Sequence, residues 1–172
     1  MMLDPVPPPA PAPEEPVSLH VNGRAADISL PKDATLLEAL RNNLGLTASR
    51  FGCGLEQCGA CMVLVDDQPR HACRLVAADQ TGCMIRTPES LAEDALGRLL
   101  VESFIAYQAA QCGYCLGGIL ITSYAWLRGL KGEPSRAEIA RTLDPHLCRC
   151  GAHPRILAAV AATAKAWLDR PR

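Results

Sequence analysis

Nine cysteines, gathered in short runs, constrain this chain of 172 residues more than any other feature. Cys58 and Cys61 are separated by two residues, and Cys148 and Cys150 by only one. An odd number of thiols in such tight local pairs does not fit a secreted disulfide framework. Clustered thiols without a visible secretion signal are typical of metal ligands, so the sequence predicts metal centres.

The first group of thiols has the spacing of a plant-type 2Fe-2S ferredoxin. Residues 51–61 read FGCGLEQCGAC, which sets Cys53, Cys58 and Cys61 at four-and-two spacing, and Cys73 follows. Interleaved glycines allow a short loop to curl around a compact cluster, with backbone amides close to its sulfurs. We expect Cys73 to complete the site from a neighbouring strand. A structural zinc site usually combines two C-x2-C pairs, so zinc is the less favoured interpretation.

The second group of thiols lies on two separate segments. Cys112 and Cys115 stand in QCGYC, where a helix is expected to end, and Cys148 and Cys150 precede another helix in HLCRCG. The four thiols meet if these helix ends are adjacent, as in an antiparallel bundle. A Cys-x-Cys pair suits adjacent ligands on one iron, so each segment is expected to serve its own iron. Spacing alone leaves a zinc ion open here, although the neighbouring ferredoxin motif favours iron and sulfur.

Hydrophobic periodicity divides the chain into a mixed part and a helical part, with a boundary near residues 87–90. Residues 1–16 hold seven of the fourteen prolines and are expected to form an extended, disordered tail. Residues 17–88 combine short strands with one helix, which predicts an α+β domain with a mixed sheet. Residues 89–172 show helical periodicity throughout and are expected to form an all-α domain.

Local signals locate the individual elements. Asn22-Gly23, flanked by alternating apolar residues, predicts a β-hairpin, and Thr35 with Glu38 predicts the start of a helix through a capping box. Further elements are expected as strands at 61–65, 71–76 and 83–87, helices beginning at the capping boxes Ser90–Glu93 and Ser135–Glu138, and helices over 117–130 and 154–167.

Together, FGCGLEQCGAC, the cysteine at 73, QCGYC and LCRCG resemble the iron–sulfur subunit of the xanthine oxidase family of molybdenum hydroxylases. The resemblance covers residues 17–168 and uses eight of the nine cysteines in order. It implies a β-grasp ferredoxin domain followed by a four-helix bundle, each with one 2Fe-2S cluster. Many members read LCRCTGY where this chain has LCRCGAHPRI, a variant similar to the small subunits of nicotinate, isoquinoline and aldehyde oxidoreductases.

The resemblance also implies roles for individual residues. The ligands of the outer cluster match Cys53, Cys58, Cys61 and Cys73, and those of the inner cluster match Cys112, Cys115, Cys148 and Cys150. Gln111 matches a position that contacts the pterin of the molybdenum cofactor, and the backbone around Cys150 has a similar role. Without the resemblance, Gln111 reads as a helix-terminal cap.

The function implied is electron transfer, with no catalytic residue in this chain. As the non-catalytic iron–sulfur subunit of an oxidoreductase, it passes electrons from the molybdenum cofactor of a large partner subunit to cytochrome c or an FAD subunit. The substrate is an aldehyde or an N-heteroaromatic compound, oxidised on the partner. Two other functions stay open: a stand-alone double 2Fe-2S ferredoxin and a zinc-stabilised interaction module.

Composition narrows the partners further. A net charge of -1 gives no reason to expect nucleic acid, and no apolar run is long enough for membrane insertion. No secretory or twin-arginine signal is visible, so we expect a cytoplasmic protein, or a periplasmic one exported with a partner. Cys83 belongs to neither thiol group and is expected to be a small buried apolar residue. Arg149, between two thiols, is expected to favour a reduced cluster.

Overall fold

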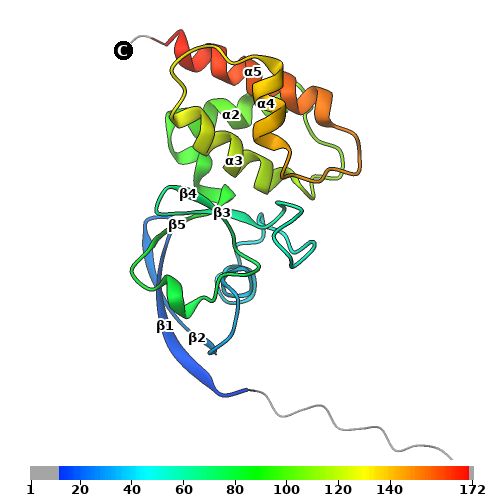
Figure 1. Ribbon diagram of the computed structural model, residues 1–172. Helices are drawn as coiled ribbons and strands as arrows, with labels where there is room; N and C mark the ends of the chain where they lie inside the picture. The colour runs from blue at the N-terminus through cyan, green and yellow to red at the C-terminus, as the bar shows by residue number, and fades with distance from the viewer. Residues whose placement is uncertain (1–11, 171–172) are drawn as a thin grey trace, which may run out of the picture.

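The computed structural model describes residues 12–170, which form a sheet unit below a helical unit (Figure 1). The sheet has five strands in the order β2-β1-β5-β3-β4. The predicted succession of a mixed-sheet domain and a helical domain is confirmed. Residues 1–11 of the expected proline-rich tail lie outside the described residues, and β1 begins at Glu14, within the range assigned to that tail.

Two tight turns organise the sheet. β1 (Glu14–Val21) and β2 (Arg24–Pro31) form the predicted antiparallel hairpin, and Asn22 and Gly23 have the positive φ angles, 50° and 75°, of its two-residue turn. The other elements of the sheet are β3 (Met62–Val65), β4 (Gln68–His71) and β5 (Met84–Arg86). β5 runs parallel to β1 and antiparallel to β3, which makes the sheet mixed.

The strand expected at 71–76 lies earlier in the chain. Asp66 and Asp67 both have positive φ angles, 49° and 64°, and form a second two-residue turn. Such a turn leads directly into the next strand, so β4 begins at Gln68 and ends at His71. Cys73 therefore lies in the turn after β4 and not on a strand.

The predicted capping box starts the helix of the sheet unit. The Glu38 amide donates to Thr35 Oγ1 at 3.2 Å, and the Thr35 amide donates to Glu38 Oε2 at 2.8 Å. The helix is short: α1 (Leu36–Glu38) continues as a wider π turn over Ala39–Asn43. Its leucines are buried with the inner residues of the strands, so this helix covers one face of the sheet.

The helical unit consists of α2 (Ala95–Ala106), α3 (Leu116–Arg128), α4 (Arg136–Leu143) and α5 (His153–Leu168). The capping box of Ser135 and Glu138 is confirmed, as is Pro154 in the first turn of α5. No helix among residues 12–170 has both the length and the apolar character needed to cross a membrane.

The capping box expected at Ser90 and Glu93 is wrong. These residues belong to a 3-10 turn, Pro88–Glu93, and the Ser90 hydroxyl donates to the Thr87 carbonyl. The chain then bends, and Asp94 caps α2 by accepting a hydrogen bond from the Gly97 amide at 2.9 Å. Asp94 is the cap because it has the extended backbone of an N-cap residue, whereas Ser90 lies inside the 3-10 turn.

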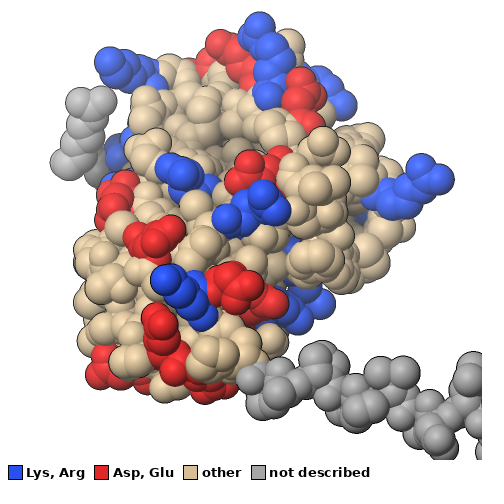
Figure 2. Space-filling view, turned by 60° about the horizontal axis from the view of Figure 1, so that its bottom comes forward, with Lys and Arg blue, Asp and Glu red and all other residues tan. Residues whose placement is uncertain are grey.

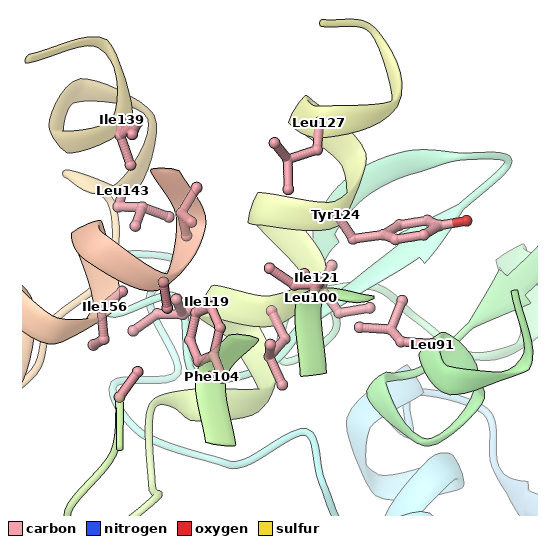
Figure 3. Close-up of a cluster of buried hydrophobic side chains, with 14 of the residues drawn as sticks. Leu91, Leu100, Phe104, Ile119, Ile121, Tyr124, Leu127, Ile139, Leu143 and Ile156 are labelled. Carbon is pink, nitrogen blue, oxygen red and sulfur yellow. The ribbon is translucent and has the colours of Figure 1, made fainter. Parts of the chain in front are cut away.

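One buried cluster joins the two units. Figure 3 shows Leu100 of α2, Ile119 and Ile121 of α3, and Ile156 of α5 gathered in the helical core. Leu64 of β3 belongs to the same cluster, together with Met62. Because α3 packs on β3, the sheet and the helices share apolar surface and are held as one body.

A polar network crosses the junction beside this core. Arg86 on β5 donates to Asp94 Oδ2 at 3.0 Å and to the Tyr124 hydroxyl of α3 at 2.8 Å, and that hydroxyl donates to the same carboxylate. Burial favours the neutral carboxyl, but these hydrogen bonds and the cap outweigh it and lower the pKa of Asp94. Elsewhere, on the face in Figure 2, basic and acidic side chains are intermingled, in keeping with the net charge of -1.

Replacement of Asp94 tests the cap and the junction together. Asp94→Ala should lower the free energy of unfolding by about 2 kcal/mol, mostly through loss of the cap, since half-exposed ion pairs contribute little. Asp94→Asn keeps a capping oxygen and should lose less. Urea unfolding followed by circular dichroism measures both.

The sign of the pH dependence follows from the lowered pKa of Asp94. The ionic contribution is complete above the ordinary pKa of an aspartate and is lost as the pH falls through the lower, folded value. The difference between wild type and Asp94→Asn should therefore shrink in acid. Equal stability of wild type and Asp94→Ala at neutral pH would contradict the proposed cap.

Candidate metal centres

The first four thiols gather where the loop before β3 meets the turn after β4. The loop is closed by a hydrogen bond from the Arg50 amide to the Ala60 carbonyl, 2.9 Å long. Its amides point at sulfur: those of Leu55 and Gln57 each donate to Cys53 Sγ at 3.3 Å. These bonds lower the pKa of Cys53 to about 7, so the thiolate is accessible near neutral pH.

These thiols form two pairs. The Cys53 amide donates to Cys58 Sγ at 3.4 Å, and the Cys58 thiol also hydrogen-bonds to Cys53. Cys61 and Cys73 are both buried, and their thiols hydrogen-bond to one another. Burial, reinforced by the Cys73 side chain, raises the pKa of Cys61 to about 12, so Cys61 is a neutral thiol near neutral pH. A cation between the sulfurs would reverse this effect, because a bound metal deprotonates its thiol ligands.

This loop needs glycine for two reasons: some positions have a positive φ angle, and another lies too close to a sulfur for a side chain. Gly54 and Gly59 have positive φ angles, 65° and 71°, which side chains rarely allow. Gly52 has an ordinary backbone, but a Cβ there would stand 2.6 Å from Cys58 Sγ. The glycines predicted to permit a tight loop are thus required both for its turns and for close contact with sulfur.

The second four thiols come from the loop between α2 and α3 and the loop between α4 and α5. All four line one small hollow, closed on its apolar side by Leu116 and Ile156. The prediction that these segments meet is confirmed by this convergence, although Cys112 follows α2 by several residues and Cys115 is the N-cap of α3.

The inner thiols pair across the two loops. The Cys112 thiol hydrogen-bonds to Cys150, and the Cys115 thiol to Cys148. Each loop was expected to serve its own iron, and the structure points to a different arrangement. The two loops lie side by side, so each thiol finds its hydrogen-bonded thiol partner on the opposite loop.

The charge states of the inner thiols follow from burial and hydrogen bonding. Burial, together with the neighbouring Cys148, raises the pKa of Cys115 to about 12. Burial also opposes ionisation of Cys148, but the amide of Ala152 and the Cys115 thiol outweigh it and lower its pKa. A backbone amide of its own loop and the Cys150 thiol lower the pKa of Cys112. In each inner pair, one sulfur thus has a lowered pKa, which favours its thiolate form.

The pairing of the thiols indicates which kind of metal centre, a single zinc ion or a 2Fe-2S cluster, these sites can hold. Among residues 12–170, no three Cys, His, Asp or Glu side chains converge as the ligands of a single ion do. A tetrahedral zinc ion draws four ligands to one point, whereas a 2Fe-2S cluster presents two irons, each with room for two thiolates. Two pairs at each site, with amides directed at sulfur, fit a 2Fe-2S cluster.

Gln111 and Cys150, the two positions that the resemblance relates to the pterin, are in contact with each other. The Gln111 side chain is exposed, and its Nε2 donates to the Cys150 carbonyl at 2.9 Å. This bond uses one of the two amide donors and ties the two inner loops together. It replaces the helix-terminal cap that the sequence alone suggested.

His146 is a residue whose role the sequence did not reveal. It is buried, with Nε2 2.8 Å from Thr122 Oγ1, and a Cβ on Gly59 would lie only 2.3 Å from its Nδ1. Burial, reinforced by His71, lowers the pKa of His146 to about 4, so it is neutral at physiological pH. No local signal predicts this contact, because Gly59 belongs to the other domain.

Two further expectations concern residues outside the thiol groups. Cys83 is partly exposed rather than buried, and it hydrogen-bonds to the Asp66 carboxylate. Burial and that carboxylate raise the pKa of Cys83, which keeps it a neutral thiol. Arg149 is exposed and lines the hollow between the outer and inner loops. That its positive charge favours a reduced cluster stays a prediction.

Comparison with known proteins agrees with this geometry. Residues 19–87 match the family of 2Fe-2S iron-sulfur cluster binding domains, and residues 87–161 match the [2Fe-2S] binding domain family. A nicotinate dehydrogenase subunit of Pseudomonas putida is 42% identical over 149 residues, which span 87% of this chain and 94% of that protein. The alpha subunit of isoquinoline 1-oxidoreductase from Brevundimonas diminuta is 35% identical over 150 residues, 87% of this chain and 97% of that one.

A solved structure shows the same arrangement. Quinoline 2-oxidoreductase from Pseudomonas putida 86 contains a chain that superposes with a TM-score of 0.82 at 32% identity, covering 90% of this chain and 96% of its own. Fold and thiols thus define a protein with two 2Fe-2S binding domains. The chain belongs to the xanthine oxidase family of molybdenum hydroxylases, as a non-catalytic iron–sulfur subunit.

The approach of α3 to the outer loop can be tested at Gly118. A Cβ at this position would lie 1.9 Å from the Gly59 carbonyl oxygen, which is backbone and cannot move aside alone. Gly118→Ala should force α3 from the loop and lower the thermal midpoint by several degrees, since overpacking costs about 1–3 kcal/mol. Gly132→Ala is the control, because a Cβ there meets nothing within 4 Å. Unchanged melting of Gly118→Ala would contradict this contact.

Proposed function

We propose that this chain carries electrons from the molybdenum cofactor of a large partner subunit, through two 2Fe-2S clusters, to a cytochrome c or flavin acceptor. The observation that carries the proposal is a hydrogen bond from the Leu147 amide to the Cys58 carbonyl, 3.0 Å long. It joins the peptide next to Cys148 directly to a residue of the outer thiol group. When bound, each 2Fe-2S cluster supplies a one-electron carrier.

We assign the ligands accordingly. Cys53, Cys58, Cys61 and Cys73 hold the outer cluster, and Cys112, Cys115, Cys148 and Cys150 hold the inner one. The thiol pairs and the amides aimed at sulfur support this assignment. The helix covering the mixed sheet supports a β-grasp ferredoxin domain, and the four packed helices support a four-helix bundle.

A large partner is favoured over a stand-alone ferredoxin because the inner site lies open. Cys112 and Gln111 are exposed, and two apolar side chains on or beside the inner loops, Ile105 and Leu147, are 72% and 71% exposed. Apolar surface beside a redox centre indicates a covering protein. We assign the remaining amide groups of Gln111 and the backbone at Cys150 to the pterin of the partner's cofactor.

The substrate class comes from the relatives. Their names include nicotinate dehydrogenase, isoquinoline 1-oxidoreductase and aldehyde oxidoreductase iron-sulfur-binding subunit. We infer that the partner oxidises an N-heteroaromatic compound or an aldehyde. This chain's residues bind, orient and shield the electron carriers and perform no bond chemistry.

The ligand assignment predicts a definite spectroscopic result. The dithionite-reduced protein should show two distinct spin-half EPR signals and about four irons per chain, the content of two 2Fe-2S clusters. Cys73→Ala should remove one signal, and Cys148→Ala the other. Cys83→Ala, which removes a thiol outside both groups, should keep both. Zinc in place of iron, with no signal, would end the electron-transfer proposal.

The link between the two loops can be tested at Leu147. Leu147→Pro removes the amide N–H that donates to Cys58, whereas Leu147→Ala keeps it. We expect electron transfer between the clusters to slow several-fold in the proline variant and to stay at the wild-type rate in the alanine variant. Flash reduction followed by optical spectroscopy measures the rate. Both variants must first show both EPR signals, and equal rates would exclude the peptide link as the route.

A further inference from the structure

Tyr114 stands between two inner thiols but reaches toward the outer loop. Its hydroxyl donates to the carbonyl of Phe51, at the start of the outer loop. The guanidinium of Arg50 lies 5.6 Å from the centroid of its ring, which adds a cation–π contact. The side chain remains 48% exposed, so its role is not to fill a core.

The outer loop is held at both of its limbs. Its two ends are closed on each other by the Arg50–Ala60 hydrogen bond. The first limb accepts the Tyr114 hydroxyl at Phe51, and the second limb accepts the Leu147 amide at Cys58. A single contact is a pivot about which a loop can turn, whereas two separated contacts determine its orientation.

Packing alone does not fix the loops at this place. Between them lies a hollow of about 470 Å³, lined by thiol-bearing residues of both groups together with Tyr114, Leu147 and Arg149. Dispersion attraction acts only between atoms in contact, so the walls of a hollow resist displacement weakly. The hydrogen bonds at its rim therefore add to the packing at Gly59 and orient the outer and inner loops across the hollow.

We propose that Tyr114 is a positioning residue for electron transfer between the two clusters: its hydroxyl, bound to the Phe51 carbonyl, fixes the separation and orientation of the two thiol loops. The inference rests on the proposed function and deepens it, since it concerns how this chain holds its two clusters relative to each other. Phenylalanine at this position would keep the ring and its contact with Arg50 but lose the bond.

The test is Tyr114→Phe in the full chain with both clusters reduced. The magnetic interaction between the two spins reports their separation, and the loss of one hydrogen bond should raise the ratio of displaced to docked conformations about fivefold. We expect a weakened and broadened interaction, with electron transfer between the clusters slowed to match. Iron content and both EPR signals should stay unchanged.

Tyr107→Phe is the matched control. Tyr107 is 45% exposed on the same loop, and its hydroxyl has no hydrogen-bond partner within residues 12–170, so its removal should leave the spin interaction at the wild-type value. An unchanged interaction in Tyr114→Phe would overturn the inference and leave the proposed function intact. Loss of a cluster from Tyr114→Phe would also overturn it, because the residue would then serve binding. Absence of a second spin from the wild type would instead refute the proposed function.

Discussion

The close approach of α3 to the backbone of Gly59 is the contact on which both thiol sites depend. A Cβ on Gly118 would meet the Gly59 carbonyl oxygen at 1.9 Å, and a Cβ on Gly59 would meet His146 at 2.3 Å. Only glycine allows two domains to meet through their backbones in this way. Because Cys115 is the N-cap of α3 and Gly59 follows Cys58, this contact brings the inner and outer thiols into one assembly.

Hydrogen bonding and burial within each thiol group set the pKa values of the thiols that would bind a metal. Amides aimed at Cys53 lower its pKa, whereas burial raises the pKa of Cys61 and Cys115. The raised pKa keeps Cys61 and Cys115 as neutral thiols until a metal binds, because a bound metal deprotonates its thiol ligands. The thiol pairs explain why two irons suit each site better than one ion. Neutral His146, between the groups, adds no charge to either of them.

Rigidity follows from contacts on several sides of the junction. Leu64 of β3 shares its apolar cluster with the helices, and Arg86 ties β5 to Asp94 and Tyr124. Near the thiols, a hollow leaves the packing incomplete, and hydrogen bonds from Tyr114 and Leu147 connect the outer loop to the helical unit. A protein that moves electrons between two carriers needs such a fixed separation, and it needs an open face where a partner can approach. We propose the exposed inner loop as that face.

The amino-acid sequence by itself determined what depends on neighbours along the chain. Thiol spacing predicted two metal centres, Asn22-Gly23 identified the hairpin, and the capping boxes at Thr35 and Ser135 marked two helices. Each of these signals acts within a few residues and is therefore visible in one segment. Only the tertiary structure decided the cap of α2, the turn that holds Cys73, the pairing of inner thiols across loops, and the burial of His146 against Gly59. These features arise where distant segments meet, and no local pattern specifies which side chain will face which.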